Sequence, residues 1–190
     1  MASPRNGFTP SRQPQPDWIR NVMVGAGGQP VCKGDAVVSN NGFIYAATAG
    51  QDPASVGYGV VLAVYTTANR PLTFLTPKFI ASGQQGRADV CFDPNQTYVV
   101  QCVTSVGISN LGKNLMIDAS AANATTGISG MSVDIPTSSS IADLFKLISL
   151  SPTEELSGKM GQTSGSFGGA NNGVEVKWNN HFLHAKTANQ

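Results

Sequence analysis

Short apolar segments separated by turn-forming residues recur along most of the chain, and they are rich in Val, Ile, Phe and Tyr. Side chains of this kind favour strands, and spacings of about ten residues between such segments are typical of all-β barrels and sandwiches. We therefore predict a mainly β fold with little helix, built as an antiparallel β-barrel or sandwich. The predicted strands cover residues 36–38, 43–47, 60–65, 97–103, 115–117, 131–135, 144–150 and 174–183.

The pair Asn41-Gly42 is the strongest turn signal in the chain. A two-residue type I′ hairpin turn needs a positive φ at both central residues, which Asn and Gly adopt most readily. Such a turn places Asn40 opposite Phe43 and Val38 opposite Tyr45. The register of the first two predicted strands follows from this pairing.

Residues 138–150 fit two kinds of local structure. Ser140 and Asp143 have the spacing of a helix-capping box, whereas the apolar residues that follow also alternate as they do in a strand. We predict a short helical turn at 140–143 that leads into the strand at 144–150. Alternation in the last strand predicts that Val174, Val176 and Trp178 face the core.

The first 20 residues differ from the rest, and we treat them as an extended N-terminal arm. The arm is rich in proline, which favours extended conformations, and Phe8 is its one large apolar residue before Trp18. Such a segment is either a disordered tail or an arm that becomes ordered on a neighbouring subunit. For the second alternative, the expected partner-binding residues are Arg5, Phe8, Arg12, Trp18 and Arg20.

The arm has too few apolar residues for a core of its own, so deletion of residues 1–17 is expected to leave the protein folded. Residues 21–190 form the β-rich body, which is long enough to bury a sizeable core. The body is either one domain or two small β modules, at about 21–80 and 81–190.

Charge is sparse, because only 12% of the residues are charged and the net charge is +1. This composition argues against nucleic acid as a partner. The sequence also lacks a secretory signal and any apolar run of the roughly 18–20 residues that a membrane helix needs, so no membrane partner is expected. A weakly charged surface suits a protein that works inside an assembly.

The residue types that carry chemistry do not form a recognisable site in the sequence. Cys32, Cys91 and Cys102 are an odd number without zinc-binding spacing, and we interpret them as buried thiols. His181 and His184 lie on a predicted strand that places them on opposite faces, so we expect surface or partner contacts rather than a metal site. We predict a protein that is not an enzyme and has no catalytic residues, no metal and no cofactor.

Five segments of the second half occur in an order that resembles the virion structural proteins of tailed bacteriophages, especially marine and cyanobacterial ones. They are 97–102 (TYVVQC), 106–117 (VGISNLGKNLMI), 125–134 (TTGISGMSVD), 144–150 and 174–181 (VEVKWNNH). The likeness covers about half of the chain, approximately residues 92–183. The first half is similar in style to the small β-barrel of many head-decoration proteins.

This resemblance implies a cement or decoration protein that binds the outside of the capsid shell after synthesis in the host cytoplasm. The implied partners are the major capsid protein and further copies of the same chain, in a dimer or a trimer. The resemblance supplies no catalytic residues. The alternative is a ligand-binding β-sandwich module on a phage tail or fibre, which binds carbohydrate or the host surface through exposed aromatic residues such as Trp18 and Tyr58.

Overall fold

The structure is a computed structural model, and it describes residues 7–48, 57–70, 78–123, 127–135, 143–150, 172–179, 181 and 183. Strands dominate these ranges, and the two helices within them are single 3₁₀ turns, η1 (Pro16–Trp18) and η2 (Ile108–Asn110). The prediction of a mainly β protein with a barrel-like architecture and little helix is confirmed.

The first half of the chain closes into a five-stranded barrel in the order β2-β5-β4-β6-β8. Its strands are β2 (Ile19–Val24), β4 (Ala36–Asn40), β5 (Phe43–Ala46), β6 (Gly57–Tyr65) and β8 (Gly86–Cys91). Two short strands, β3 (Val31–Cys32) and β7 (Phe79–Ile80), pair with each other outside this ring.

The β4–β5 hairpin has the predicted register. Asn40 pairs with Phe43 and Val38 pairs with Tyr45. The turn residues have positive φ angles, 49° at Asn41 and 82° at Gly42, as a type I′ turn requires. Local turn chemistry therefore determines this part of the barrel.

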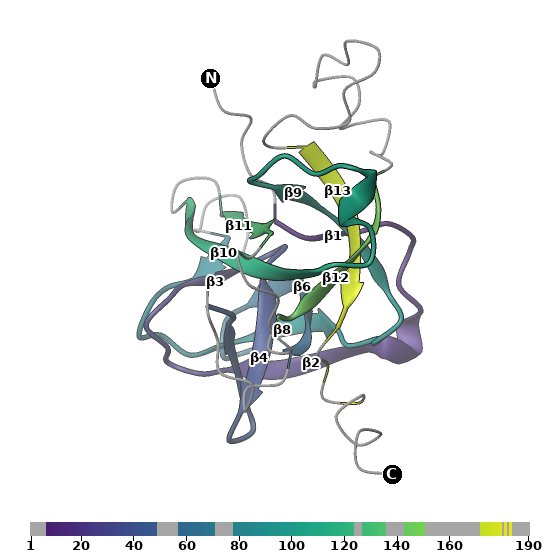
Figure 1. Cartoon of the computed structure of the whole chain (residues 1–190). Helices are drawn as coiled ribbons and strands as arrows, with labels where there is room; N and C mark the ends of the chain where they lie inside the picture. The colour runs from purple at the N-terminus through teal and green to yellow at the C-terminus, as the bar shows by residue number, and fades with distance from the viewer. Residues whose placement is uncertain are drawn as a thin grey trace.

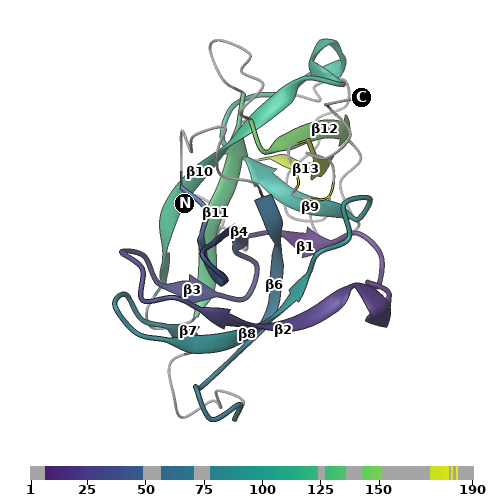
Figure 2. The same cartoon turned by 90° about the horizontal axis from the view of Figure 1, so that it is seen from below.

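The second half of the chain forms another closed ring of strands. Its members are β9 (Thr97–Cys102), β10 (Asn114–Asn123), β11 (Ile128–Asp134), β12 (Phe145–Ser149) and β13 (Asn172–Trp178). The order is β9-β11-β10-β12-β13, and a long antiparallel pairing between β13 and β9 closes the ring. Figures 1 and 2 both show β9 and β13 in the upper part of the molecule and β2 in the lower part.

The two rings have the same connectivity. In each, the five strands lie in the order first, third, second, fourth, fifth, and the fifth pairs with the first. The first and third strands are parallel and share a single pair of residues, Val24 with Ile44 in one ring and Cys102 with Val133 in the other. The remaining pairings are antiparallel in both rings. The chain is thus a tandem of two barrels of one topology, joined by residues 92–96.

The inward residues of the last strand were predicted correctly, since Val174, Val176 and Trp178 are all buried. The strand itself ends at Trp178, five residues before its predicted end. The strand predicted at 144–150 is confirmed as β12. The helical turn predicted at 140–143 lies outside the described residues except for its last position, Asp143.

The N-terminal arm packs on its own chain. Its strand β1 (Thr9–Pro10) pairs antiparallel with β9 and lies between the two barrels in both views (Figures 1 and 2). Phe8 is only 2% exposed, and its ring stacks on Phe145 at a centroid distance of 4.5 Å and meets the ring of Tyr98 edge-on at 6.4 Å. Phe8 therefore fills the second barrel instead of presenting an exposed anchor. The burial of Phe8 argues against the expectation that residues 1–17 are dispensable for folding.

Candidate partner-binding surface

An aromatic–arginine cluster, consisting of Trp18, Arg20, Tyr58 and Phe92, lies at one end of the first barrel. Phe92 is buried at its centre, with the Trp18 ring 5.2 Å and the Tyr58 ring 6.4 Å from it, centroid to centroid. The Arg20 guanidinium carbon lies 4.9 Å from the Phe92 ring centroid, within the range of a cation–π interaction. Trp18 and Tyr58 are half-buried and Arg20 is exposed, so the cluster presents aromatic faces and a positive charge together.

Local structure brings these four residues together. The 3₁₀ turn η1 places Trp18 just before β2, and the backbone N–H of Phe92 donates a 2.9 Å hydrogen bond to the Trp18 carbonyl oxygen. Arg20 follows on β2, and Tyr58 comes from the start of β6. Burial raises the pKa of Tyr58, and the nearby positive charge of Arg20 partly offsets this effect.

His181 is fully buried and is hydrogen-bonded to the backbone of Tyr58, one of the residues of the cluster. The backbone N–H of Leu183 donates to Nδ1 of His181 at 3.2 Å, so this nitrogen carries no proton. The neutral ring then has its proton on Nε2, which lies 2.8 Å from the carbonyl oxygen of Tyr58 and donates to it. The expected surface or partner role of His181 is therefore wrong, and His184 lies outside the described residues.

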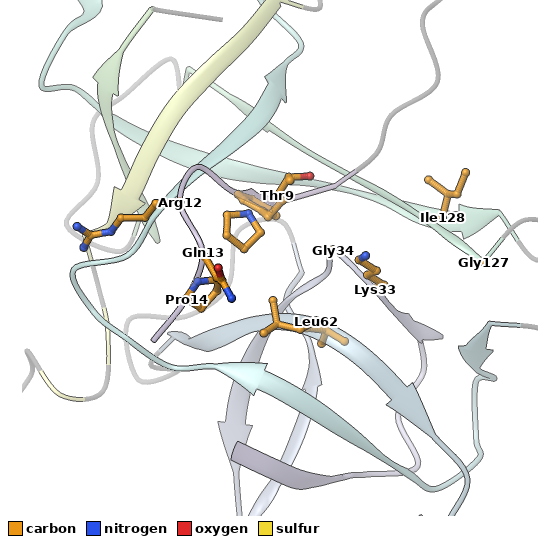
Figure 3. Close-up of a pocket in the computed structure, with 12 residues that line it drawn as sticks. Thr9, Arg12, Gln13, Pro14, Lys33, Gly34, Leu62, Gly127 and Ile128 are labelled. Carbon is orange, nitrogen blue, oxygen red and sulfur yellow. The ribbon is translucent and has the colours of Figure 1, made fainter. Parts of the chain in front are cut away.

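A second feature, the arm groove, has a volume of about 490 Å³ and lies between the arm and the seam of the two barrels (Figure 3). This volume is within the roughly 300–1,000 Å³ typical of ligand pockets. The lining comes from the arm, the β3–β4 turn, β6 and the start of β11: Phe8, Thr9, Pro10, Arg12, Gln13, Pro14, Lys33, Gly34, Val61, Leu62, Gly127 and Ile128.

The arm groove is mainly apolar with a few polar groups. Gln13 and Pro14 lie on one side and Lys33 and Ile128 on the other, with Leu62 between them (Figure 3). Ile128 is 38% exposed, which is high for a large aliphatic side chain in this structure. None of the described residues that line the groove is acidic, whereas Arg12 and Lys33 are both basic.

The four predicted partner-binding residues that the structure describes are distributed over three places. Trp18 and Arg20 meet in the aromatic–arginine cluster, as their proximity in sequence allows. Arg12 lies at the rim of the arm groove, and its guanidinium points away from the other lining residues (Figure 3). Phe8 is in the core, and Arg5 lies outside the described residues.

The structure confirms that Cys32, Cys91 and Cys102 are buried, and none of the three forms a disulfide. Burial is the largest cause of a raised pKa at each of them, and a raised thiol pKa leaves little of the reactive thiolate. In the part of the chain that the structure describes, no group of three or more His, Cys, Asp or Glu side chains has an arrangement that could hold a metal ion.

Two sequence comparisons with known proteins gave no match. No protein-family model matches the chain, and no curated protein matches it significantly in sequence. No helix within the described ranges is both long enough and apolar enough to cross a lipid bilayer.

Sequence reasoning missed two residues of these surfaces. Phe92 follows the last residue of β8 and was assigned no role, although an aromatic residue directly before the Asp93-Pro94 turn is a usable signal for a strand-end contact. Lys33 was assigned no role, and nothing in its local sequence indicates that it lines the groove. Their roles depend on contacts with residues far away in the chain.

Proposed function

We propose that the protein is a non-enzymatic virion structural protein that binds the outside of a tailed-phage capsid and stabilises the shell as a head-decoration protein. The observation that carries the proposal is the aromatic–arginine cluster. Trp, Tyr and Arg are the residue types that dominate the energetics of protein–protein interfaces, and here they surround one ring at a barrel end. The order of segments in the second half, which is similar to virion proteins, supports the same proposal.

The surface chemistry is compatible with binding to a large protein lattice. Arg20 has its guanidinium over Phe92, and no ion pair to it is present among the described residues. Its charge is therefore available for a carboxylate of the capsid protein. Many copies on one lattice also gain avidity, so each single contact needs only modest affinity.

Rebinding to capsids tests the proposal. Heads of the encoding phage, stripped of their decoration, are mixed with purified protein, and occupancy is measured by quantitative gel analysis of sedimented heads. We expect saturable binding, and about tenfold or more weaker binding for Trp18→Ala and Arg20→Ala, since interface residues of this kind typically contribute above 1–2 kcal/mol. Light scattering at two salt concentrations establishes whether the free protein is a dimer, a trimer or a monomer.

Matched controls separate this surface from general effects. Arg70→Ala removes an exposed arginine and Leu111→Ala removes an exposed apolar side chain, both away from the cluster. Arg20→Lys keeps the charge and Trp18→Phe keeps an aromatic ring, so both are expected to recover part of the binding. Protein that is folded but does not sediment with stripped heads at any concentration would contradict the proposal.

A second candidate function is a ligand-binding module for carbohydrate or a host surface, located on a tail or fibre. The observation that favours it is the half-buried pair Trp18 and Tyr58, whose rings both lie near the ring of Phe92, since sugar rings stack on accessible aromatic faces. A glycan screen distinguishes the two. Selective glycan binding that Trp18→Ala abolishes, without binding to heads, would favour the module.

A further inference from the structure

The arm groove lies where three parts of the chain meet. Its lining comes from the N-terminal arm, from the first barrel and from β11 of the second barrel, around a volume of about 490 Å³. Sites at the junction of structural units, with apolar walls and a few polar groups, are typical of small-molecule ligands. The groove therefore has the location and the size of a ligand-binding site.

The accessible apolar surface of the groove is aliphatic. Leu62 and Pro14 are half-buried, and Ile128 is 38% exposed. Phe8 also lines the groove, but its ring is buried against Phe145 and offers no face for stacking. An alkyl chain gains free energy by burying its CH₂ groups against such walls, whereas a planar ring would find no aromatic partner among the described lining residues.

Lys33 supplies the positive charge within the groove. Its side chain is exposed and forms no ion pair with a described residue, whereas the Arg12 guanidinium points away from the other lining residues (Figure 3). The carboxylate of Asp35, close by in sequence, is buried and accepts hydrogen bonds from the Cys32 N–H and the Ser129 hydroxyl. An anionic group is therefore the complement of the Lys33 ammonium.

The order of these residues along the groove indicates how such a ligand lies. A parallel β-bridge joins Lys33 to Ile128, so the charge and the most exposed aliphatic residue of the groove are neighbours on one side. Leu62 lies between this side and Pro14 on the other (Figure 3). An anionic group at Lys33 therefore lets an attached chain extend over Leu62 towards Pro14.

We infer that the arm groove binds a free fatty acid, with the carboxylate paired to Lys33 and the alkyl chain along the aliphatic lining. This inference goes beyond the proposed function, since binding to a capsid requires no small ligand. A ligand that binds only the folded state stabilises that state. Because the arm and both barrels line the groove, a bound chain contacts all three parts and holds the arm more firmly.

The test uses the purified full-length protein and sodium octanoate, at concentrations well below those at which octanoate forms micelles. Binding is followed by methyl and amide resonances in heteronuclear NMR spectra. We expect saturable shifts at Lys33, Leu62 and Ile128, with none at the aromatic–arginine cluster. Hydrogen exchange of the Ser11 amide, which is bonded to β9, is expected to slow. Octylammonium, which reverses the charge, and acetate, which lacks the chain, are each expected to bind at least about threefold more weakly.

Two pairs of variants separate the groove from the rest of the surface. Lys33→Gln is expected to weaken octanoate binding about threefold, as loss of a surface ion pair does, whereas Lys113→Gln at an exposed lysine outside the groove should have no effect. Ile128→Asn is expected to weaken binding roughly fivefold, and Ile148→Asn, at an equally exposed isoleucine outside the groove, is its control. Lys33→Gln changes only an exposed side chain, so the test does not depend on whether the fold tolerates Ile128→Asn.

Absence of saturable shifts at several millimolar octanoate overturns the inference. Shifts confined to residues outside the groove, equal binding of octylammonium, or tighter binding of the acidic peptide acetyl-Val-Glu-Val-amide in the groove overturn it as well. The outcome is separate from that of the proposed function. Octanoate binding by a protein that does not bind stripped heads would leave the groove site without the capsid role, and the reverse result would leave the capsid role without the groove site.

Discussion

The hydroxyl of Ser129 donates a 2.5 Å hydrogen bond to Oδ1 of Asp35, and this contact joins the two barrels. Asp35 follows the β3–β4 turn of the first barrel, and Ser129 is on β11 of the second. Both side chains are buried, at 2% and 1% exposure. Oδ2 of Asp35 also accepts the backbone N–H of Cys32 at 2.8 Å. Because this carboxylate is buried where the two barrels meet, its ionisation is expected to affect how stably the barrels pack together.

The raised pKa of Asp35 leads to a prediction of how the free energy of unfolding depends on pH. Burial raises the pKa of Asp35 from 3.8 to about 6, although hydrogen bonds from Ser129 and Cys32 oppose the rise. Below pH 3.8 the carboxyl is protonated in both the folded and unfolded states. As the pH increases through 4 to 6, the unfolded chain ionises first, so the free energy of unfolding falls by about 3 kcal/mol and then stays level. Urea unfolding between pH 3 and pH 8 measures this.

The substitution Asp35→Asn isolates this contribution, because the amide stays neutral and still offers an acceptor to the Cys32 N–H. Its free energy of unfolding is expected to lose the decline between pH 4 and pH 6. Asp17→Asn removes an exposed carboxylate in η1 and serves as the control, with the decline retained. Identical pH profiles for Asp35→Asn and the original protein would refute the assignment.

The conformation and close packing of Gly7 lead to a prediction about how firmly the N-terminal arm is attached to the barrels. Its φ is +66°, and a Cβ there would lie 2.4 Å from the Cβ of Ser129 and 2.5 Å from the Gly34 carbonyl oxygen. Gly7→Ala is therefore expected to displace the start of the arm and cost roughly 1–3 kcal/mol or more. Hydrogen exchange at the Ser11 amide, which bonds to Thr97, should accelerate.

Gly28→Ala is the matched control for this prediction. Gly28 has open space where its Cβ would be, so the substitution should leave the Ser11 amide unchanged. Equal protection of that amide in Gly7→Ala and in the original protein would mean that the arm is not held at this point.

The fold followed from the sequence where local chemistry determines it. The Asn41-Gly42 turn fixed the first hairpin, and alternation identified the inward face of β13. The order of the strands could not be predicted in this way, because the pairing of β13 with β9 joins residues 70 to 80 positions apart in the sequence and no local pattern specifies it. The identical topology of the two barrels likewise appears only in the pairings.

The residues of the aromatic–arginine cluster and the arm groove were predicted less well, because they too depend on contacts between residues far apart in the sequence. Trp18 and Arg20 were named as expected partner-binding residues of the N-terminal arm, and the structure places them side by side at Phe92. Phe8 was misassigned because a single aromatic residue in a proline-rich segment was interpreted as an exposed anchor. In the structure it packs on Phe145, which is far away in the sequence. His181 was misassigned because two of its contacts are hydrogen bonds with the backbone of Tyr58 and Leu183, and such contacts carry no sequence signal.

Phe8 itself provides the third prediction. Phe8→Ala removes a ring packed between Phe145 and Tyr98, and large-to-small changes of this kind cost about 3–5 kcal/mol. Urea unfolding measures the loss, and Leu111→Ala, at an exposed position, should stay within about 0.5 kcal/mol of the original protein. A deletion of residues 1–17 should be at least as destabilising as Phe8→Ala. A loss below 1 kcal/mol would show that the arm does not fill the second barrel in solution.

The last prediction concerns His181, which contacts Trp178 of the second barrel and Tyr58 of the first. Its ring meets Trp178 edge-on at 5.6 Å, and its Nε2 holds the backbone of Tyr58, a member of the aromatic–arginine cluster. His181→Ala removes the Nε2 donor to the Tyr58 carbonyl oxygen and leaves a cavity where the imidazole was. We therefore expect the free energy of unfolding to fall by about 2–4 kcal/mol.

The same substitution should also shift the NMR resonance of the Trp18 indole, because Tyr58 and Trp18 both pack on Phe92. His181→Gln provides a donor that can reach the Tyr58 carbonyl and is expected to recover part of the stability. Leu183→Ala changes an exposed side chain in the same segment and should have little effect on either measurement. If Leu183→Ala and His181→Ala were equally destabilising, the effect would belong to docking of the whole segment, and the imidazole would have no special role in holding the cluster.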